Sequence, residues 1–103
     1  MAHVLPQAAE ENAQIDADLD RLLTVWSRVP EVARIWSGWD PEDRVTYFVE
    51  WSIPDDLLAR VEDLARRGQL SPEQHERLRT AHDLADRHRP TLDRLFSRER
   101  RLS

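Results

Sequence analysis

The chain has 103 residues, of which 40% are apolar and 34% are charged, and its formal net charge is −5. These values predict one small globular domain with a modest core. The chain has no cysteine, and all fifteen basic residues are arginine, which excludes disulfides, thiolate metal sites, cysteine nucleophiles and lysine Schiff bases. Because there are only two glycines, a glycine-rich phosphate-binding loop is excluded as well.

Acidic residues dominate the first part of the chain and arginines the last. Residues 1–63 carry 14 acids and 5 arginines, whereas residues 64–103 carry 6 acids and 10 arginines. This asymmetry indicates either charge pairing within the fold or two different partners, and pairing is the more common cause. No apolar run reaches the length of a membrane span, and the N-terminus lacks a secretory signal pattern. We therefore expect a cytoplasmic protein.

The expected organisation is a flexible segment over residues 1–7, a helical domain over 8–96 and a basic polar tail over 97–103. A long first helix is predicted from Ala8 onwards, because the apolar residues that follow recur at helical spacing and form one stripe. This stripe consists of Ile15, Leu19, Leu22, Leu23, Trp26 and Val29. Pro30 is expected to end or bend this helix.

Residues 35–43, IWSGWDPED, contain two tryptophans on either side of Gly38. Asp40 and the proline after it predict the start of a new helix. Trp36 then closes the preceding segment and is expected to face inward, whereas Trp39 is the candidate for exposure. The side chain expected to pack against Trp39 is Arg44, which predicts a cation–π contact.

The segment RVTYFVEW, residues 44–51, is ambiguous between helix and strand. Its β-branched and aromatic residues favour a strand, but they do not alternate and no second strand-like run exists, so we predict a helix over 41–51. Its apolar residues fall on two faces, one with Val45, Phe48 and Val49 and one with Tyr47 and Trp51. The second face is either buried within the bundle or forms a partner surface.

Two further helices are predicted from their end signals. Pro54 opens one of them, and Gly68 provides its left-handed stop. Ser71 and Gln74 form a capping box that opens the next, which is expected to end at Pro90 and to be followed by a last short helix. The short connection between the two helices predicts an antiparallel hairpin. The predicted fold is all-α, a small bundle of four to five helices.

No cofactor, metal site or catalytic site is predicted. His75 and His82 share a helix face with Asp86, but two turns of helix place the imidazoles about 10 Å apart, too far to bind one ion unaided. The adjacent acids Asp55 and Asp56 are explained by the positive N-terminal end of a helix rather than by acid–base catalysis. We therefore expect a protein that is not an enzyme.

The expected function is a non-enzymatic protein–protein interaction module, such as a bacterial adaptor, inhibitor or antitoxin-like protein. Its partner is another protein or a second copy of the chain. The residues expected to bind the partner are Trp39, Tyr47, Trp51 and Arg44. Acids of the first half of the chain would steer a basic partner toward them.

The alternative function is a small nucleic-acid-associated regulator. Residues 64–79 have the outline of a helix–turn–helix, and the segment LSPEQ within them resembles helix openings in many regulators, region four of sigma factors among them. The arginines that would contact nucleic acid are Arg66, Arg67, Arg77, Arg87, Arg89, Arg98, Arg100 and Arg101. Glu73 and Glu76 open the second helix and would face phosphates unfavourably. A third alternative is a sensor that holds a small ligand between helices.

Overall fold

The computed structural model describes residues 6–102, and this part of the chain contains helices and no strand. The elements are α1 (Pro6–Ser27), α2 (Val29–Ile35), the 3₁₀ turn η1 (Trp36–Gly38), α3 (Pro41–Glu50), α4 (Ser52–Arg66) and α5 (Pro72–Leu102). The all-α prediction is confirmed, and the ambiguous residues 44–50 are helical. Within the described residues, no helix combines the length and the apolar character needed to cross a bilayer.

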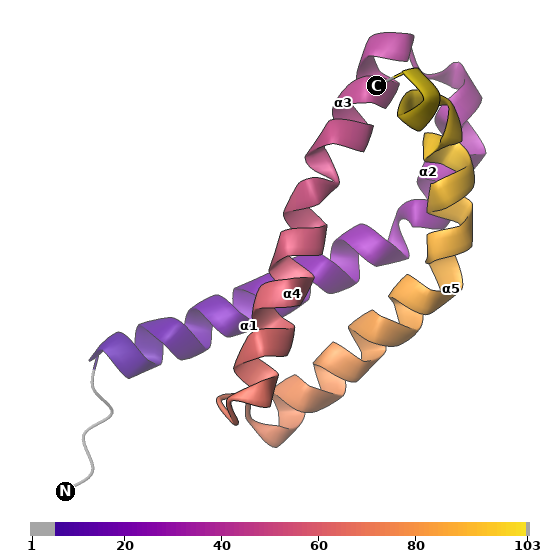
Figure 1. Ribbon diagram of the computed structural model, residues 1–103. Helices are drawn as coiled ribbons and strands as arrows, with labels where there is room; N and C mark the ends of the chain where they lie inside the picture. Colours follow the sequence, from indigo (N-terminus) through magenta and orange to yellow (C-terminus); the bar gives the residue numbers. More distant parts are fainter. Residues whose placement is uncertain (1–5, 103) are drawn as a thin grey trace, which may run out of the picture.

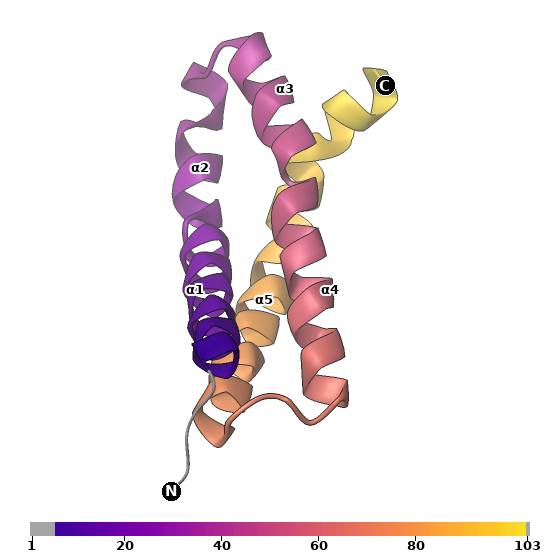
Figure 2. The ribbon, with the colours of Figure 1, turned by 90° about the vertical axis from the view of Figure 1, so that its left-hand side faces the viewer.

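The helix α1 is the element that holds the others together (Figures 1 and 2). It packs against both α4 and α5, and it contacts each of them more extensively than they contact each other. The predicted apolar stripe is buried apart from Leu23, which is partly buried, and Leu19, Leu22 and Trp26 are fully inaccessible. The helices α4 and α5 diverge from their connection (Figure 1), so the expected hairpin is not confirmed as a closely packed pair.

The predicted helix ends are present in the structure. The helix α1 ends at Ser27, and Pro30 lies in the first turn of α2. Gly68 follows α4 with a φ of 73°, a conformation that glycine adopts without steric cost. The capping box also forms, because the Ser71 N–H donates to Gln74 Oε1 at 2.9 Å and the Gln74 N–H donates to Ser71 Oγ at 3.2 Å.

The helix α5 does not end at Pro90, so that prediction is wrong. Pro90 lies inside this single helix of 31 residues. A proline within a helix removes one backbone hydrogen bond and crowds the preceding turn, and Figure 1 shows α5 bent between its orange and yellow parts. The helix persists because Leu92 and Phe96, which follow the proline, are almost completely buried.

The helices α1 and α5 extend into the two ends of the chain. Residues 1–5 of the expected flexible segment lie outside the described residues, and residues 6–7 belong to α1. Residues 97–102, expected as a polar tail, continue α5. The molecule is elongated, with principal extents of 58 × 23 × 20 Å.

Candidate partner-binding surface

The seven aromatic side chains of the protein form one continuous cluster. They are Trp26, Trp36, Trp39, Tyr47, Phe48, Trp51 and Phe96, and each ring lies within 6.2 Å of at least one other, centroid to centroid. Aromatic pairs gain energy beyond the area that they bury. The cluster therefore explains why α3 is helical, since a helix turns its ring-bearing positions toward α1 and α5.

The burial of the rings decreases along the cluster from the core to the surface. Trp51 is 5% exposed and meets the fully buried Trp26 edge to face, with centroids 4.9 Å apart. Trp36, Trp39 and Tyr47 are half-buried. Burial raises the pKa of Tyr47 to about 12. Of the three aromatic residues predicted to bind a partner, Trp51 therefore belongs to the core, while Trp39 and Tyr47 reach the surface.

Arg44 holds the end of η1 instead of stacking on Trp39. Its Nε donates a hydrogen bond to the carbonyl oxygen of Trp36 at 3.0 Å, and its Nη2 donates to that of Ser37 at 3.0 Å. The Trp36 carbonyl oxygen also accepts a hydrogen bond from the Trp39 N–H at 3.1 Å, so the guanidinium adds a second donor to it and ties it to the neighbouring carbonyl of Ser37. The predicted cation–π contact is therefore replaced by a backbone cap. A cation–π contact does form elsewhere, with the Arg89 guanidinium 4.7 Å from the Trp26 ring centroid.

Trp39 and Tyr47 line an open depression on the surface of α3. Its volume is about 310 Å³, and its other lining residues are Asp43, Thr46 and Glu50. The two rings stand at 86° to each other with centroids 5.5 Å apart, so they form a corner. Among the side chains that the structure describes, none makes a hydrogen bond or ion pair with Asp43 or Glu50. The depression therefore combines an aromatic corner with two unpaired carboxylates.

A second apolar feature lies on the outer face of α3 and α4. Val45, Val49 and Ile53 are 46%, 60% and 43% exposed, and their spacing of four residues places them in one row along the helices. We call these three residues the outer row. The sequence pattern predicts Val45 and Val49 on one face with Phe48, and in the structure Phe48 alone of these three packs inward, against Phe96.

Sequence reasoning missed the outer row because α3 carries apolar residues on two faces with equal periodicity. A signal was nevertheless present. Tyr47, Phe48 and Trp51 occupy one side of the helix, and their rings bury more surface than two valines can. Ranking the two faces by side-chain area would have directed the aromatic face inward and left the valines exposed.

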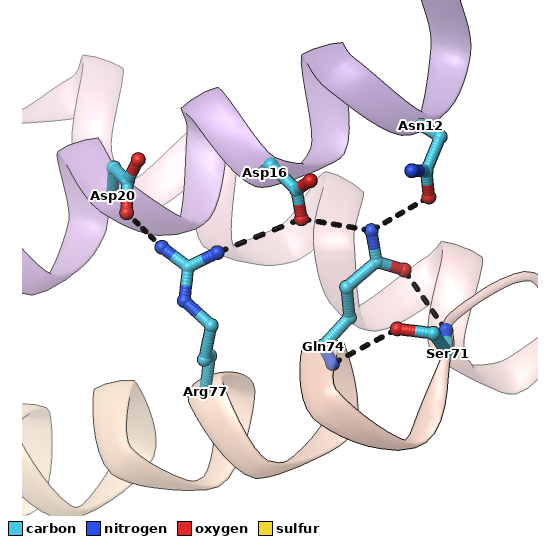
Figure 3. Close-up of polar contacts among 6 residues, drawn as sticks. All are labelled: Asn12, Asp16, Asp20, Ser71, Gln74 and Arg77. Carbon is cyan, nitrogen blue, oxygen red and sulfur yellow. Dashed lines mark hydrogen bonds and ion pairs between the residues drawn. The ribbon is translucent and has the colours of Figure 1, made fainter. Parts of the chain in front are cut away.

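The polar contacts between α1 and α5 join acids of the first half to the basic second half (Figure 3). Arg77 forms ion pairs with Asp20 and, at 3.5 Å, with Asp16. The Gln74 Nε2 donates hydrogen bonds to Asn12 Oδ1 at 2.9 Å and to Asp16 Oδ1 at 3.0 Å. The charge asymmetry of the sequence is thus partly cancelled inside the fold.

The other arginines of the nucleic-acid alternative are mostly paired as well. Their ion-pair partners are Asp63 for Arg66 and Arg67, Asp55 for Arg89, and Asp93 for Arg100. Arg101 donates to the carbonyl oxygen of Ser97, while Arg87 and Arg98 are exposed. Five of the eight arginines therefore contact carboxylates, which weakens the basic surface that a phosphate backbone requires.

The histidines do not gather into a ligand set. His82 lies 3.1 Å from a Glu62 oxygen, and His75 is exposed. In the described part of the chain, no group of three or more His, Asp or Glu side chains is arranged to hold a metal ion. Asp55 lies in the first turn of α4, as expected, and also pairs with Arg89.

Comparison with protein-family models, with curated proteins and with solved structures found no match for this chain. Its function must therefore be inferred from the residues themselves. Two features of the described surface that offer apolar or aromatic groups to a partner are the outer row and the depression between Trp39 and Tyr47, and both lie on α3 or at its edges.

Proposed function

We propose that this protein is a non-enzymatic protein–protein interaction module, and that it binds a basic amphipathic helix of a partner along the outer row. The observation that carries this proposal is the exposure of Val45 and Val49 on α3 and of Ile53 at the start of α4, each four residues from the next. Apolar side chains scattered singly over a surface are ordinary, whereas a contiguous line of them favours a binding role. An amphipathic helix is the partner that such a line accommodates.

The acidic side chains beside the outer row favour a basic partner, and the arginines that line depressions with Ile53 are Arg21 and Arg60. Glu42, Glu50 and Asp56 are exposed, and helical spacing places them beside the row. Two copies of the protein that met through this surface would bring these carboxylates together, and like charges disfavour such a complex. A partner helix with arginine or lysine on either side of its apolar stripe would pair with them and be steered toward the site.

The proposal is tested by selecting a displayed library of amphipathic helical peptides for binding to the full chain. Binders with basic flanks are expected. They should lose affinity for the double variant Val45→Ser/Val49→Ser, because the apolar line is gone. This variant should stay folded, since both side chains are largely exposed in the native state. The matched control is Ala59→Ser, at an exposed position of α4 outside the row.

Two outcomes contradict the proposal. The first is that the selected peptides bind the double variant as tightly as the unchanged chain. The second is that light scattering finds a dimer whose dissociation constant rises in the double variant, which would make a second copy the occupant of the row.

A further inference from the structure

We propose that the corner formed by Trp39 and Tyr47 is a receptor for one guanidinium group, supplied by an arginine side chain of the partner. This inference rests on the proposed function and deepens it, because it names the side chain that the partner presents. The corner lies beside the outer row, since Tyr47 and Glu50 of its lining share a second depression with Ile53.

The two rings are held in place before any ligand arrives. Trp36 lies behind both of them, with centroid distances of 5.4 Å to Trp39 and 5.8 Å to Tyr47. Tyr47 also packs against Trp51 and Phe96 of the core. A site whose walls are already ordered spends little conformational entropy on binding. The rings therefore offer a fixed aromatic surface to the depression.

The ring faces and the carboxylates at the corner favour the binding of a cation. The face of an aromatic ring attracts a cation that lies within about 6 Å of the ring centroid. Asp43 and Glu50 add two carboxylates, which are two turns apart on one side of α3. Neither carboxylate has a partner among the described side chains, and the Thr46 hydroxyl is occupied, since it donates to the carbonyl oxygen of Glu42 at 3.0 Å.

A guanidinium matches this combination better than other cations do. It is planar and weakly hydrated, so it can stack on an indole while its edge donates hydrogen bonds to carboxylates. A quaternary ammonium has no N–H to offer to Asp43 or Glu50, and a lysine ammonium is more strongly hydrated. The depression, at about 310 Å³, is at the lower limit for ligand pockets, which suits the end of one side chain.

The arginine of the chain that is nearest in sequence does not fill the corner. Arg44 is bound to the carbonyl oxygens of Trp36 and Ser37. The guanidinium that stacks on a tryptophan within the described residues belongs to Arg89, and it lies over the core residue Trp26. Arg21 lines the neighbouring depression with Tyr47 and Glu50, but the residues that line the corner include no arginine. The guanidinium for the corner therefore comes from the partner.

The experiment follows the ring and indole resonances of Trp39 and Tyr47 by NMR in the full chain. N-acetyl-arginine amide is expected to shift them in a saturable manner. N-acetyl-citrulline amide, which is nearly isosteric and neutral, should leave them unchanged, and the trimethyl-lysine analogue should bind more weakly. The inference is overturned if citrulline shifts them equally, if trimethyl-lysine binds more tightly, or if arginine shifts nothing.

Variants assign the effect to the corner. The double variant Asp43→Asn/Glu50→Gln should weaken arginine binding by about tenfold, because charge-assisted hydrogen bonds are lost. The control Glu42→Gln removes one carboxylate of the same helix outside the depression and should bind as the unchanged chain does. If both variants bind arginine equally, the corner is not the receptor.

The two proposals can fail separately. The Val45→Ser/Val49→Ser variant should still bind N-acetyl-arginine amide, because neither valine lines the depression. If arginine binds at the corner while the peptide selection fails, the outer row is not a partner site. If the selection succeeds through the outer row while arginine binds nowhere, only the guanidinium receptor is refuted.

Discussion

The Gln74 side chain both caps a helix and joins that helix to another. It closes the capping box with Ser71 and also reaches α1 through hydrogen bonds to Asn12 and Asp16. It is only 3% exposed, and a buried amide is tolerated when its donors and acceptors are paired. The capping box was predictable from local spacing, whereas the contacts to α1 were not.

Changing Gln74→Glu should destabilise the fold by about 1–3 kcal/mol. The carboxylate can still accept from the Ser71 N–H, but it has no N–H for Asn12 and it faces the Asp16 carboxylate. Urea unfolding measures the change. The control Gln69→Glu adds the same charge at an exposed position and should change stability by less than about 0.5 kcal/mol. Equal effects in both variants would contradict this role of Gln74.

Tyr47 is the single tyrosine of the chain, so its ionisation can be followed without interference from another phenol. Burial raises its pKa from 10.0 to about 12 in the folded protein. Because the folded state holds the proton more tightly than the unfolded state, this stabilisation is complete below pH 10 and is lost as the pH rises from 10 to about 12.

Ultraviolet absorbance of the phenolate should therefore show a midpoint near 12 in the native protein and near 10.0 in denaturant. Circular dichroism recorded in parallel reports whether the chain is still folded at each pH. A native midpoint equal to that of the denatured chain, with the helices intact, would mean that Tyr47 is open to solvent.

At the scale of elements, the second half of α5 is part of the core although it follows a proline. Leu92 is fully buried, and Phe96 contacts the rings of Trp36, Tyr47, Phe48 and Trp51. The burial of these side chains outweighs the cost of a proline inside a helix, which is about 3 kcal/mol. The bend directs this half of α5 toward the aromatic cluster.

Replacing Phe96→Ala should therefore cost about 3–5 kcal/mol, because a ring is removed from the centre of the cluster and leaves a cavity. Thermal or denaturant unfolding measures the loss. Arg98→Ala changes an exposed side chain two positions further along the same helix and should be nearly neutral. If Phe96→Ala is also neutral, residues beyond Pro90 do not support the fold.

At the scale of the whole molecule, the unequal charge of the two halves is resolved partly by contact between them. Arg77 pairs with Asp16 and Asp20, and Arg89 pairs with Asp55. Exposed ion pairs of this kind add little stability each. Their larger effect is on the outside of the molecule, since they neutralise arginines that would otherwise attract phosphate.

We therefore expect no binding of a short duplex DNA by the full chain, even at low salt. Fluorescence anisotropy of labelled DNA measures this. The variant Asp20→Asn serves as a comparison. It removes one of the two ion-pair partners of Arg77, so it should bind DNA better than the unchanged chain does. A rise in anisotropy with the unchanged chain that falls steeply with salt would instead support the nucleic-acid alternative.

Local signals in the sequence determined much of this protein. Pro30, Gly68 and the Ser71–Gln74 capping box mark helix ends because each acts on the backbone within a few residues. The apolar stripe of α1 was predictable as well. That helix has a single apolar face, and this is the face that packs against the core.

The tertiary structure alone decided the features that depend on competition between distant groups. Helical periodicity did not indicate which of the two apolar faces of α3 would be buried. The aromatic face packs inward because it contacts the rings of Trp26 and Phe96. Pro90 remained helical because buried contacts beyond it outweigh its local cost. The exposed row of Val45, Val49 and Ile53 is the consequence of the first of these outcomes, since a helix that turns one face inward leaves the other at the surface.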